Sequence, residues 1–454
     1  MAEERVVVVG GGLAGMAAAV ALESRGRRVT LLEARKTLGG RAGSFEDPQT
    51  GETLDNCQHV LLGCCTNLLD FYRRIGVSGL IRWHDTMYFV DPRGGVHHLE
   101  SISGLPAPFH LGWSLANFAA LTFAQRLHLS QAMLSLMRLG KSGRMRLADI
   151  PFGQWLSDHH QTRELIDTLY ELILVSALNE DCQKTSAMYA IQVFQEALLE
   201  NAAGYRMGTP ACPLGKLYET LPCRDVRTGA RMTGLKFSGS RVVAVEMGDE
   251  SIEAEAIVLA VNHPALQKWI PEDLAKSDGR FAGLEKLESV PILGAHLWFD
   301  RPVMNLPHAA LIGGPLQWLF GKDETGAALH GVISAARDWT GKSKEESLEL
   351  FVDQIRRTFP AAREAKLVRG VIVIEKRATF SPRPGVDQLR PGQAPPAGGI
   401  EGLYLAGDYT QTGWPATMEG AVRSGYLAAE AICGEKFLVS DLPREWPARL
   451  LATD

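Results

Sequence analysis

The sequence has little of several features that would point to a function class at once. Its seven cysteines include no pair spaced as CxxC, so neither a zinc site nor a disulfide framework is expected. Basic residues are scattered apart from a short cluster at Lys141, Arg144 and Arg146, and the net charge is −5. No nucleic-acid partner and no metal are therefore predicted.

Long apolar runs and targeting signals are also missing. The first ten residues lack the basic start and apolar stretch of a secretory signal, so we expect a cytoplasmic protein. The longest apolar stretch, Leu111–Phe123, is shorter than the roughly 20 residues that span a bilayer. With Leu127–Leu139 it predicts an apolar helical region near 105–139, either buried or in peripheral contact with the inner face of the cell membrane.

Length and composition predict a folded protein with two lobes. The 454 residues exceed what one hydrophobic core usually organises, and hydrophobic and charged residues make up 46% and 22%.

The clearest motif lies at the N-terminus. Residues 5–34 follow the order strand, glycine turn, helix, strand, and Gly10, Gly12 and Gly15 form GxGxxG at the turn. Gly10 permits the tight turn, Gly12 lets the backbone approach a pyrophosphate, and Gly15 lets the helix pack on the sheet. Free N–H groups at the helix start favour the phosphates. Glu33 ends the second strand, where a carboxylate accepts hydrogen bonds from ribose and repels a 2′-phosphate.

The residues after Glu33 favour FAD over NAD. Arg35 leads into Gly39, Gly40 and Arg41, where paired glycines let the backbone run beside a cofactor and Arg41 is available to the pyrophosphate. At this point the sequence resembles the flavin amine oxidase and phytoene desaturase superfamily. The resemblance implies an α/β fold, with a Rossmann-like FAD-binding domain and a second, mixed α+β substrate domain.

A second segment, residues 403–425 (LYLAGDYTQTGWPATMEGAVRSG), resembles the same superfamily more specifically. The resemblance implies that Gly407 and Asp408 bind the ribityl or pyrophosphate part of FAD. It also implies that Thr417 and Met418 begin a helix facing the flavin ring, and that the backbone of Val226 contacts adenine. A helix N-terminus near the ring stabilises the charge of reduced flavin.

These motifs come from both ends of the chain, so we expect a discontinuous FAD-binding domain. It comprises residues 1–75, 205–270 and 400–434, with a hairpin within 242–261 that returns to the sheet. The substrate domain comprises 76–204 and 271–399. The tail, 435–454, carries no interpretable motif.

No second GxGxxG stands between a strand and a helix, so the flavin needs an external electron donor. Amine oxidases carry a lysine on a strand that corresponds here to VPILGAHLWFDRP, and Gly294 stands at its position. Amine oxidation is therefore disfavoured.

Residues 54–76 (LDNCQHVLLGCCTNLLDFYRRIG) resemble the hydroxysqualene dehydroxylases. That resemblance implies reduction of hydroxysqualene, an isoprenoid alcohol, to squalene in hopanoid or triterpene synthesis. Two alternatives remain open: a carotenoid-type desaturase running in the opposite direction, and a non-catalytic isoprenoid carrier, which would need no tightly held flavin.

Loss of an allylic hydroxyl needs a general acid and a dry pocket. Asp55 and His59 are the candidates, since both follow the glycine–arginine segment closely. The structural alternative is that Asp55 caps a turn and His59 is a hydrogen-bonded core residue. Cys57, Cys64 and Cys65 are expected to be small packing residues.

Overall fold

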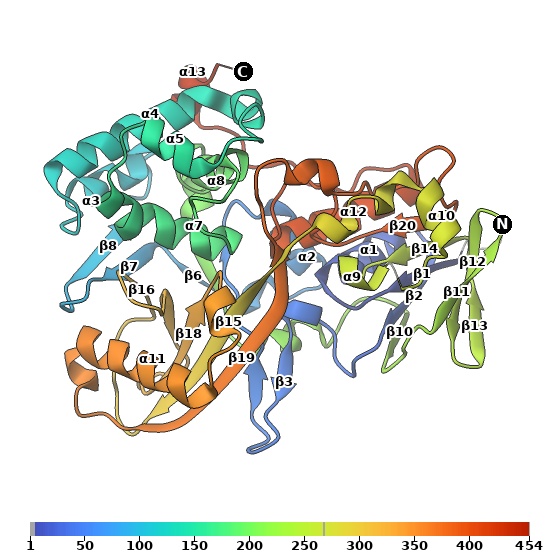
Figure 1. The fold of residues 1–454 in the computed structure, drawn as a ribbon, viewed down its shortest axis with the longest axis horizontal. Coiled ribbons are helices and arrows are strands. Elements are labelled where there is room, and N and C mark those ends of the chain that lie inside the picture. Colours follow the sequence, from blue (N-terminus) through green and yellow to red (C-terminus); the bar gives the residue numbers. More distant parts are fainter. Residues whose placement is uncertain (1–4, 267, 454) are drawn as a thin grey trace.

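The computed structural model describes residues 5–266 and 268–453, and has two lobes (Figure 1). The right-hand lobe in Figure 1 is built on a parallel sheet of five strands. Short runs of buried valine, isoleucine and leucine form the three inner strands, as is typical of a sheet covered on both faces. In order across the sheet the strands are β10 (Asp225–Thr228), β2 (Arg28–Glu33), β1 (Arg5–Val9), β14 (Ala256–Leu259) and β20 (Leu403–Leu405). The fold is the expected α/β arrangement, and the strands come from three distant parts of the chain.

Two helices from opposite ends of the chain cross beside this sheet, α1 (Leu13–Glu23) and α12 (Met418–Cys433). A Cβ atom on Gly425 would lie 2.2 Å from the carbonyl oxygen of Ala14. The small residues of α12 therefore let the two backbones approach closely, as the sequence predicts.

An antiparallel sheet packs at the outer side of this lobe. It consists of β11 (Gly234–Ser238), β12 (Arg241–Met247) and β13 (Glu250–Glu253). The hairpin predicted within 242–261 is confirmed as β12 and β13, after which β14 joins the parallel sheet.

The second lobe contains a seven-stranded sheet, seen at the lower left of Figure 1. Helix α11 (Lys344–Thr358) covers one face, where Leu293 and Leu297 pack with Phe351. Side chains alternate along a strand, so Gly294, His296 and Trp298 lie on the opposite face. In order the strands are β19 (Leu367–Phe380), β15 (Ser289–Phe299), β18 (Ala328–Ile333), β17 (Trp318–Gly321), β16 (His308–Leu311), β7 (Thr86–Val90) and β8 (Val96–Glu100).

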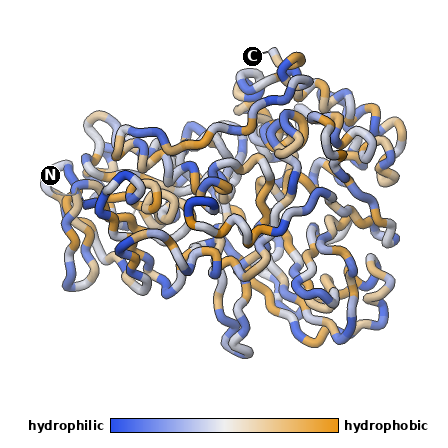
Figure 2. The backbone as a smooth tube through the Cα atoms, turned by 180° about the vertical axis from the view of Figure 1, so that it is seen from behind, coloured by the Kyte–Doolittle hydropathy of each residue, from blue (hydrophilic) through white to orange (hydrophobic). Residues whose placement is uncertain are grey.

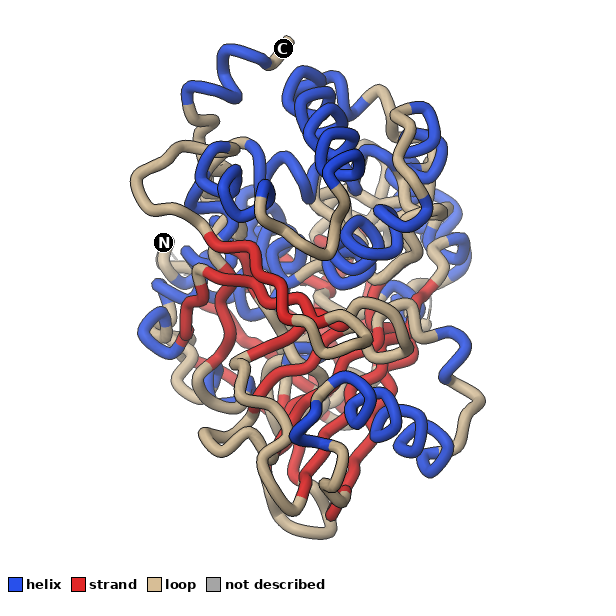
Figure 3. Tube along the Cα trace, turned by 90° about the vertical axis from the view of Figure 1, so that its left-hand side faces the viewer, coloured by secondary structure: helices blue, strands red, loops and turns tan. Residues whose placement is uncertain are grey.

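Helices gather over one end of this lobe, while the strands occupy the other end (Figure 3). The helices are α3 (Gly112–Ala116), α4 (Phe123–Met145), α5 (Phe152–Asp158), α6 (Arg163–Leu165), α7 (Glu171–Leu178), α8 (Ala187–Phe194) and α13 (Trp446–Leu451).

The apolar region near 105–139 differs from the expected helical pair. Its first part forms only the short helix α3, whereas its second part belongs to the longer α4, which Thr122 and Gln125 cap reciprocally. Trp113 and Phe123 are 70% and 78% exposed, so the region is not simply buried. Among the described residues, no helix is long and apolar enough to cross a membrane.

The tail beyond residue 434 is part of the fold. Asn67 exchanges hydrogen bonds with Val439, and Thr453 donates to the carbonyl of Arg138 on α4. The remaining elements are α2 (Thr66–Arg74), α9 (His263–Leu266), α10 (Glu272–Ser277), the hairpin β3 (Ser44–Glu46) and β4 (Thr53–Asp55), and the small sheet of β5 (Leu61–Leu62), β9 (Met207–Pro210) and β6 (Ile81–His84). The tip of the β3–β4 hairpin projects from the molecule and is hydrophilic (Figure 2).

Candidate functional site

The turn between β1 and α1 has the geometry of a phosphate-binding loop. Gly10 has φ +112°, and a Cβ atom there would lie 2.4 Å from the carbonyl oxygen of Ala260. A Cβ on Gly15 would lie 1.9 Å from the carbonyl oxygen of Gly10. A Cβ on Gly12 would meet no atom within 4 Å, and α1 begins there without a side-chain cap. The loop therefore presents open space and helix N–H groups to an anion.

Glu33 organises the end of β2. Its carboxylate accepts hydrogen bonds from the backbone N–H groups of Gly11 and Arg35, both at 2.7 Å. Each carboxylate oxygen has a further lone pair for a ribose hydroxyl. The side chain of Arg35 is exposed, so its assignment to the cofactor stays a prediction.

The paired glycines lie directly against the phosphate loop. Gly39 forms a bridge with Gly12, and both Gly39 and Gly40 have positive φ, at +106° and +58°. A Cβ on Gly40 would lie 3.1 Å from the Cα of Gly12. Only glycine brings the two backbones this close, which places both sides of a pyrophosphate cradle together.

Arg41 and Asp408 join the two predicted halves of the cofactor site. The guanidinium binds the carboxylate through two bonds, Nη2–Oδ1 at 2.6 Å and Nη1–Oδ2 at 2.9 Å. Burial opposes the charge on Arg41, but Asp408 outweighs it, so the pKa of Arg41 is raised. Arg41 also donates to the carbonyl of Ala378 on β19. The two residues assigned to the cofactor thus contact each other, and Arg41 also ties the site to the seven-stranded sheet.

The start of α12 completes this half of the site. Gly407 has φ +147° and its N–H donates to the Ser424 hydroxyl at 2.8 Å. The Thr417 hydroxyl caps α12 by accepting from the N–H of Gly420 at 3.0 Å, and Met418 begins the helix, half-buried.

Val226 lies in the middle of β10, an outermost strand of the sheet, rather than at the carboxyl end of the strand, where ligands bind. It pairs with Leu31 on β2, whereas Thr228 pairs with Glu33 at the carboxyl end. Ligands of parallel sheets bind beyond the carboxyl ends of the strands. The residues of this segment nearest the nucleotide edge are therefore Thr228 and Ala230, whose N–H donates to the carbonyl of Glu33.

Asp55 is held as a hydrogen-bond acceptor, which argues against its predicted role as a proton donor. Its Oδ1 accepts from the Ser44 hydroxyl at 2.7 Å and from the N–H of Leu214 at 2.9 Å. Its Oδ2 lies 3.6 Å from the Nζ of Lys322. A carboxylate so bound fastens β3 and β4 to the 214 loop, as in the structural alternative.

His59 is half-buried, and its Nδ1 donates to the carbonyl of Cys57 at 3.0 Å. Burial lowers the pKa of His59, so the ring is neutral and Nε2 carries the lone pair. The Cys57 thiol is buried, which raises its pKa to about 12 and makes it a packing residue.

Two further histidines, neither among the predicted catalytic residues, lie behind this segment. His296 and His330 face each other across β15 and β18, with ring centroids 4.0 Å apart. His296 donates from Nε2 to the carbonyl of Asp55 at 2.9 Å. His330 is fully buried, and neither ring nitrogen has a partner among the described residues.

Taken together, the glycine loop, Glu33 and the Arg41–Asp408 pair provide a phosphate cradle, a ribose acceptor and an enclosed polar centre, which fit FAD. The family model described as flavin containing amine oxidoreductase matches residues 13–433. The chain belongs to this family.

Relatives of this flavin oxidoreductase include carotenoid enzymes. The 15-cis-phytoene desaturase of Synechococcus elongatus is 26% identical over 478 residues, covering 99% of both chains. The 15-cis-phytoene desaturase of an Oncidium hybrid cultivar is 28% identical over 456 residues, covering 94% of this chain and 77% of that protein. The structure of cyclohexylamine oxidase from Brevibacterium oxydans IH-35A matches with a TM-score of 0.66 at 19% identity, covering 95% and 98%, which shows the shared fold. The chain is an FAD-dependent oxidoreductase.

Arg390 supports the cofactor site of this flavin oxidoreductase, although no sequence motif reveals it. Arg390 is buried, and its guanidinium donates to the backbone carbonyls of Asp408, Tyr409 and Thr410. It therefore holds the loop that carries Asp408. Its only signal in the sequence is a charged residue inside a Pro- and Gly-rich linker.

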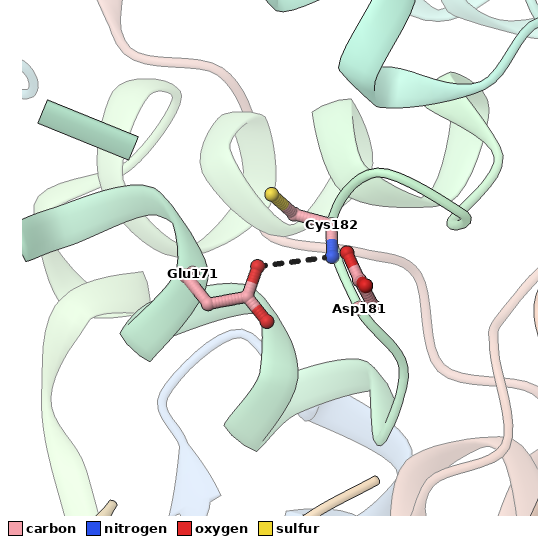
Figure 4. Close-up of side chains that lie close together, drawn as sticks. All are labelled: Glu171, Asp181 and Cys182. Carbon is pink, nitrogen blue, oxygen red and sulfur yellow. Dashed lines mark hydrogen bonds between the residues drawn. The ribbon is translucent and has the colours of Figure 1, made fainter. Parts of the chain in front are cut away.

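One other group of side chains could suggest chemistry. Within the described residues, Glu171, Asp181 and Cys182 form the group whose potential metal ligands approach one another, within 4.8 Å (Figure 4). Glu171 already accepts from the N–H of Cys182 at 3.1 Å. Burial strongly raises the pKa of the Cys182 thiol, which therefore keeps its proton. The group serves to close the α7–α8 connection.

Proposed function

We propose that this flavin oxidoreductase reduces hydroxysqualene to squalene. The resemblance of residues 54–76 to hydroxysqualene dehydroxylases supports this substrate. The phytoene desaturases among the relatives are also named for a long isoprenoid, so a lipophilic substrate agrees with both. When bound and reduced, FAD supplies the hydride for such a reaction.

The observation that carries the proposal is the character of the sheet face behind the glycine–arginine segment. Trp298, Trp318 and Phe320 lie on this face with His296 and His330, and burial lowers the pKa of both histidines. The charged residues of the face, Arg369 and Glu375, lie on the outer strand β19. An apolar, aromatic surface suits a polyene and keeps water from a carbocation. Neutral histidines supply proton transfer without a fixed charge.

A carotenoid-type desaturase is the second candidate, and the comparisons favour it. Its reaction removes a hydride and a proton from neighbouring carbons, whereas dehydroxylation adds a proton to the leaving oxygen and a hydride to carbon. Both reactions need one proton-transfer residue in a dry pocket, so the same face suits either.

Product analysis separates the two. The purified flavoprotein is incubated anaerobically with hydroxysqualene in its photoreduced form and with phytoene in its oxidised form. We expect squalene from the first mixture and no new double bond in the second. A desaturated product from phytoene, with hydroxysqualene unchanged, would replace the proposal by the second candidate.

We also propose that the enzyme takes its lipid substrate from the inner face of the cell membrane. Exposed apolar residues project from the helical end, and Phe109 and Trp446 lie with ring centroids 6.2 Å apart. Residues 101–148 contain no Asp or Glu, and their exposed basic residues Arg138, Lys141 and Arg146 suit anionic headgroups, whereas Arg144 is buried against Glu196. Sedimentation with phosphatidylglycerol vesicles, but not with phosphatidylcholine vesicles, is the expected result. We further propose that an external electron donor reduces the flavin, because the sequence has no second GxGxxG between a strand and a helix.

A further inference from the structure

The space beside Gly294 is where a lysine would stand in an amine oxidase, and here a histidine fills it. A Cβ atom on Gly294 would lie 2.9 Å from His330 Nε2, 3.2 Å from the Asn56 carbonyl oxygen and 3.5 Å from the Cys57 Cα. Glycine at 294 is therefore what admits the His330 ring, which reaches this point from the neighbouring strand β18.

This position connects to the cofactor cradle through a single residue. The Asn56 side chain donates to the carbonyl of Gly40 at 3.3 Å, and Gly40 lies against Gly12 of the phosphate loop. The Asn56 carbonyl faces the same point as His330 Nε2. His330 is thus separated from the glycine–arginine segment only by the backbone of residues 56–57.

Among the described residues, His330 shares with His110 and His308 a buried ring whose two nitrogens have no hydrogen-bond partner. A buried polar group without a partner destabilises the fold, so it needs an explanation. What distinguishes His330 is its place beside Gly294 and the Asn56 carbonyl, one residue from the cofactor cradle.

The neighbours of His330 explain its protonation state. His296 lies across the strand pair, with ring centroids 4.0 Å apart, while the charges of Lys322 and His59 act on the ring electrostatically. Burial, then these three groups in turn, hold its pKa well below the ordinary value. Asp55 balances part of this charge through its contact with Lys322. The resting ring is neutral, with a lone pair available.

We propose that His330 exchanges a proton with the substrate while the flavin exchanges the hydride. This inference rests on the proposed function and names a residue for it. In dehydroxylation, protonated His330 gives its proton to the hydroxyl, the C–O bond breaks with its electron pair, and water leaves. The resulting allylic cation accepts a hydride from reduced flavin. In desaturation, a hydride passes to oxidised flavin, neutral His330 takes the neighbouring C–H proton, and the double bond forms.

The chain offers a matched control in His308. It is also fully buried, with both ring nitrogens unpartnered, and burial lowers its pKa to about 4. It lies on the same sheet face but farther along, since Phe320 pairs with His330 on one side and with His308 on the other. A purely structural role for buried histidines would affect both positions alike.

The experiment compares His330→Phe and His330→Asn with His308→Phe in the flavin-loaded enzyme. Flavin content and melting temperature establish that each variant folds, and if His330→Phe does not fold, His330→Asn alone is compared with His308→Phe. We expect single-turnover rates to fall at least about 100-fold at position 330, within the range of a lost proton-transfer group, and less than about threefold for His308→Phe. A further variant, His330→Ala, leaves a space for imidazole, and added imidazole is expected to restore part of its rate. Equal losses at both positions, or no loss at 330, would overturn the inference.

A second readout is independent of turnover. In protein labelled with ¹⁵N-histidine, the His330 ring, assigned by its absence in His330→Phe, is expected to be neutral with oxidised flavin. It is expected to gain a proton after photoreduction, because reduced flavin is anionic. If neither hydroxysqualene nor phytoene reacts, the proposed function fails, and this measurement alone decides on His330. A ring that stays neutral in both states would contradict its role.

Discussion

The phosphate loop and the histidine face are linked through Gly40 and Asn56, yet they follow from the sequence in different ways. Gly10, Gly12 and Gly15 lie within six residues. A Cβ atom would overlap a carbonyl oxygen at Gly10 and at Gly15, whereas Gly12 leaves open space for a pyrophosphate. The histidine face combines His59, His296 and His330 from three distant segments, with Gly294 as the residue that makes room. Local spacing reveals the first kind of site, whereas the second exists only after the strands have paired.

The largest effects are expected from replacing Gly15 or Gly12 of the phosphate loop by alanine, one at a time. Gly15→Ala places a Cβ 1.9 Å from the Gly10 carbonyl oxygen, so we expect a loss of about 3 kcal/mol in apoprotein stability. Gly12→Ala meets no protein atom and is expected to cost about 1 kcal/mol or less. Its methyl group points where the pyrophosphate is expected, so FAD should bind at least about tenfold more weakly.

Urea denaturation of the two apoproteins and FAD titration measure these effects. Equal apoprotein stabilities for the two variants would contradict the assigned roles. Unchanged FAD affinity in Gly12→Ala would move the pyrophosphate elsewhere.

The second lobe depends on a buried ion pair that makes its stability sensitive to acid. Glu180 is fully buried and binds Arg337 through Oε1 at 2.9 Å and Oε2 at 2.6 Å. Burial alone would raise the pKa of Glu180, but Arg337 and Ser381 outweigh it and lower the pKa. Its stabilising effect is therefore complete above the unfolded pKa of about 4.3 and is lost as pH falls through the lower folded value.

Replacing Glu180 by Gln is expected to cost about 2 kcal/mol at pH 7. The difference from the wild type should shrink below pH 4, when measured by thermal unfolding across pH 3–7. Glu345→Gln, on the exposed first turn of α11, is the matched control and should change little. A difference that stays constant down to pH 3 would contradict this account of the ion pair.

The parts of the fold that the sequence predicted share one physical property, which is that each of their elements carries a local sequence pattern, although distant segments then assemble them. The parallel sheet, the β12–β13 hairpin and the small residues of α12 follow from glycine geometry and side-chain periodicity. The predicted apolar helix pair was partly wrong, because Thr122 begins α4 only after a short α3. Asp55 was predicted as an acid, but Ser44 and the N–H of Leu214 hold it as an acceptor. Neither partner is recognisable from spacing in the sequence.

Gly294 tests how tightly the histidine face is packed. Gly294→Ala brings a methyl group against His330 Nε2 and the Asn56 carbonyl, with an expected cost of about 1.5 kcal/mol. In a His330→Ala background the cost should fall by more than half, because the ring no longer occupies the space. Calorimetry on the four proteins of this cycle measures the coupling, and additive effects would show that the two residues do not compete for one space.

The smallest effect is expected at the cap of α12. Thr417→Ala removes the hydrogen bond from the Gly420 N–H and should cost about 1 kcal/mol. Thr417→Ser keeps the hydroxyl and should retain most of the stability. If Ala and Ser have the same melting temperature, the cap contributes nothing to the helix start.

Measuring the direction of electron flow distinguishes reduction of hydroxysqualene from desaturation. The photoreduced enzyme is mixed anaerobically with hydroxysqualene while the flavin absorbance is followed and the lipid products are extracted. The account predicts that the yellow oxidised flavin returns, with one squalene formed for each flavin reoxidised. The account is contradicted if the flavin stays reduced with hydroxysqualene, while phytoene is desaturated by the oxidised enzyme and its flavin loses the yellow colour.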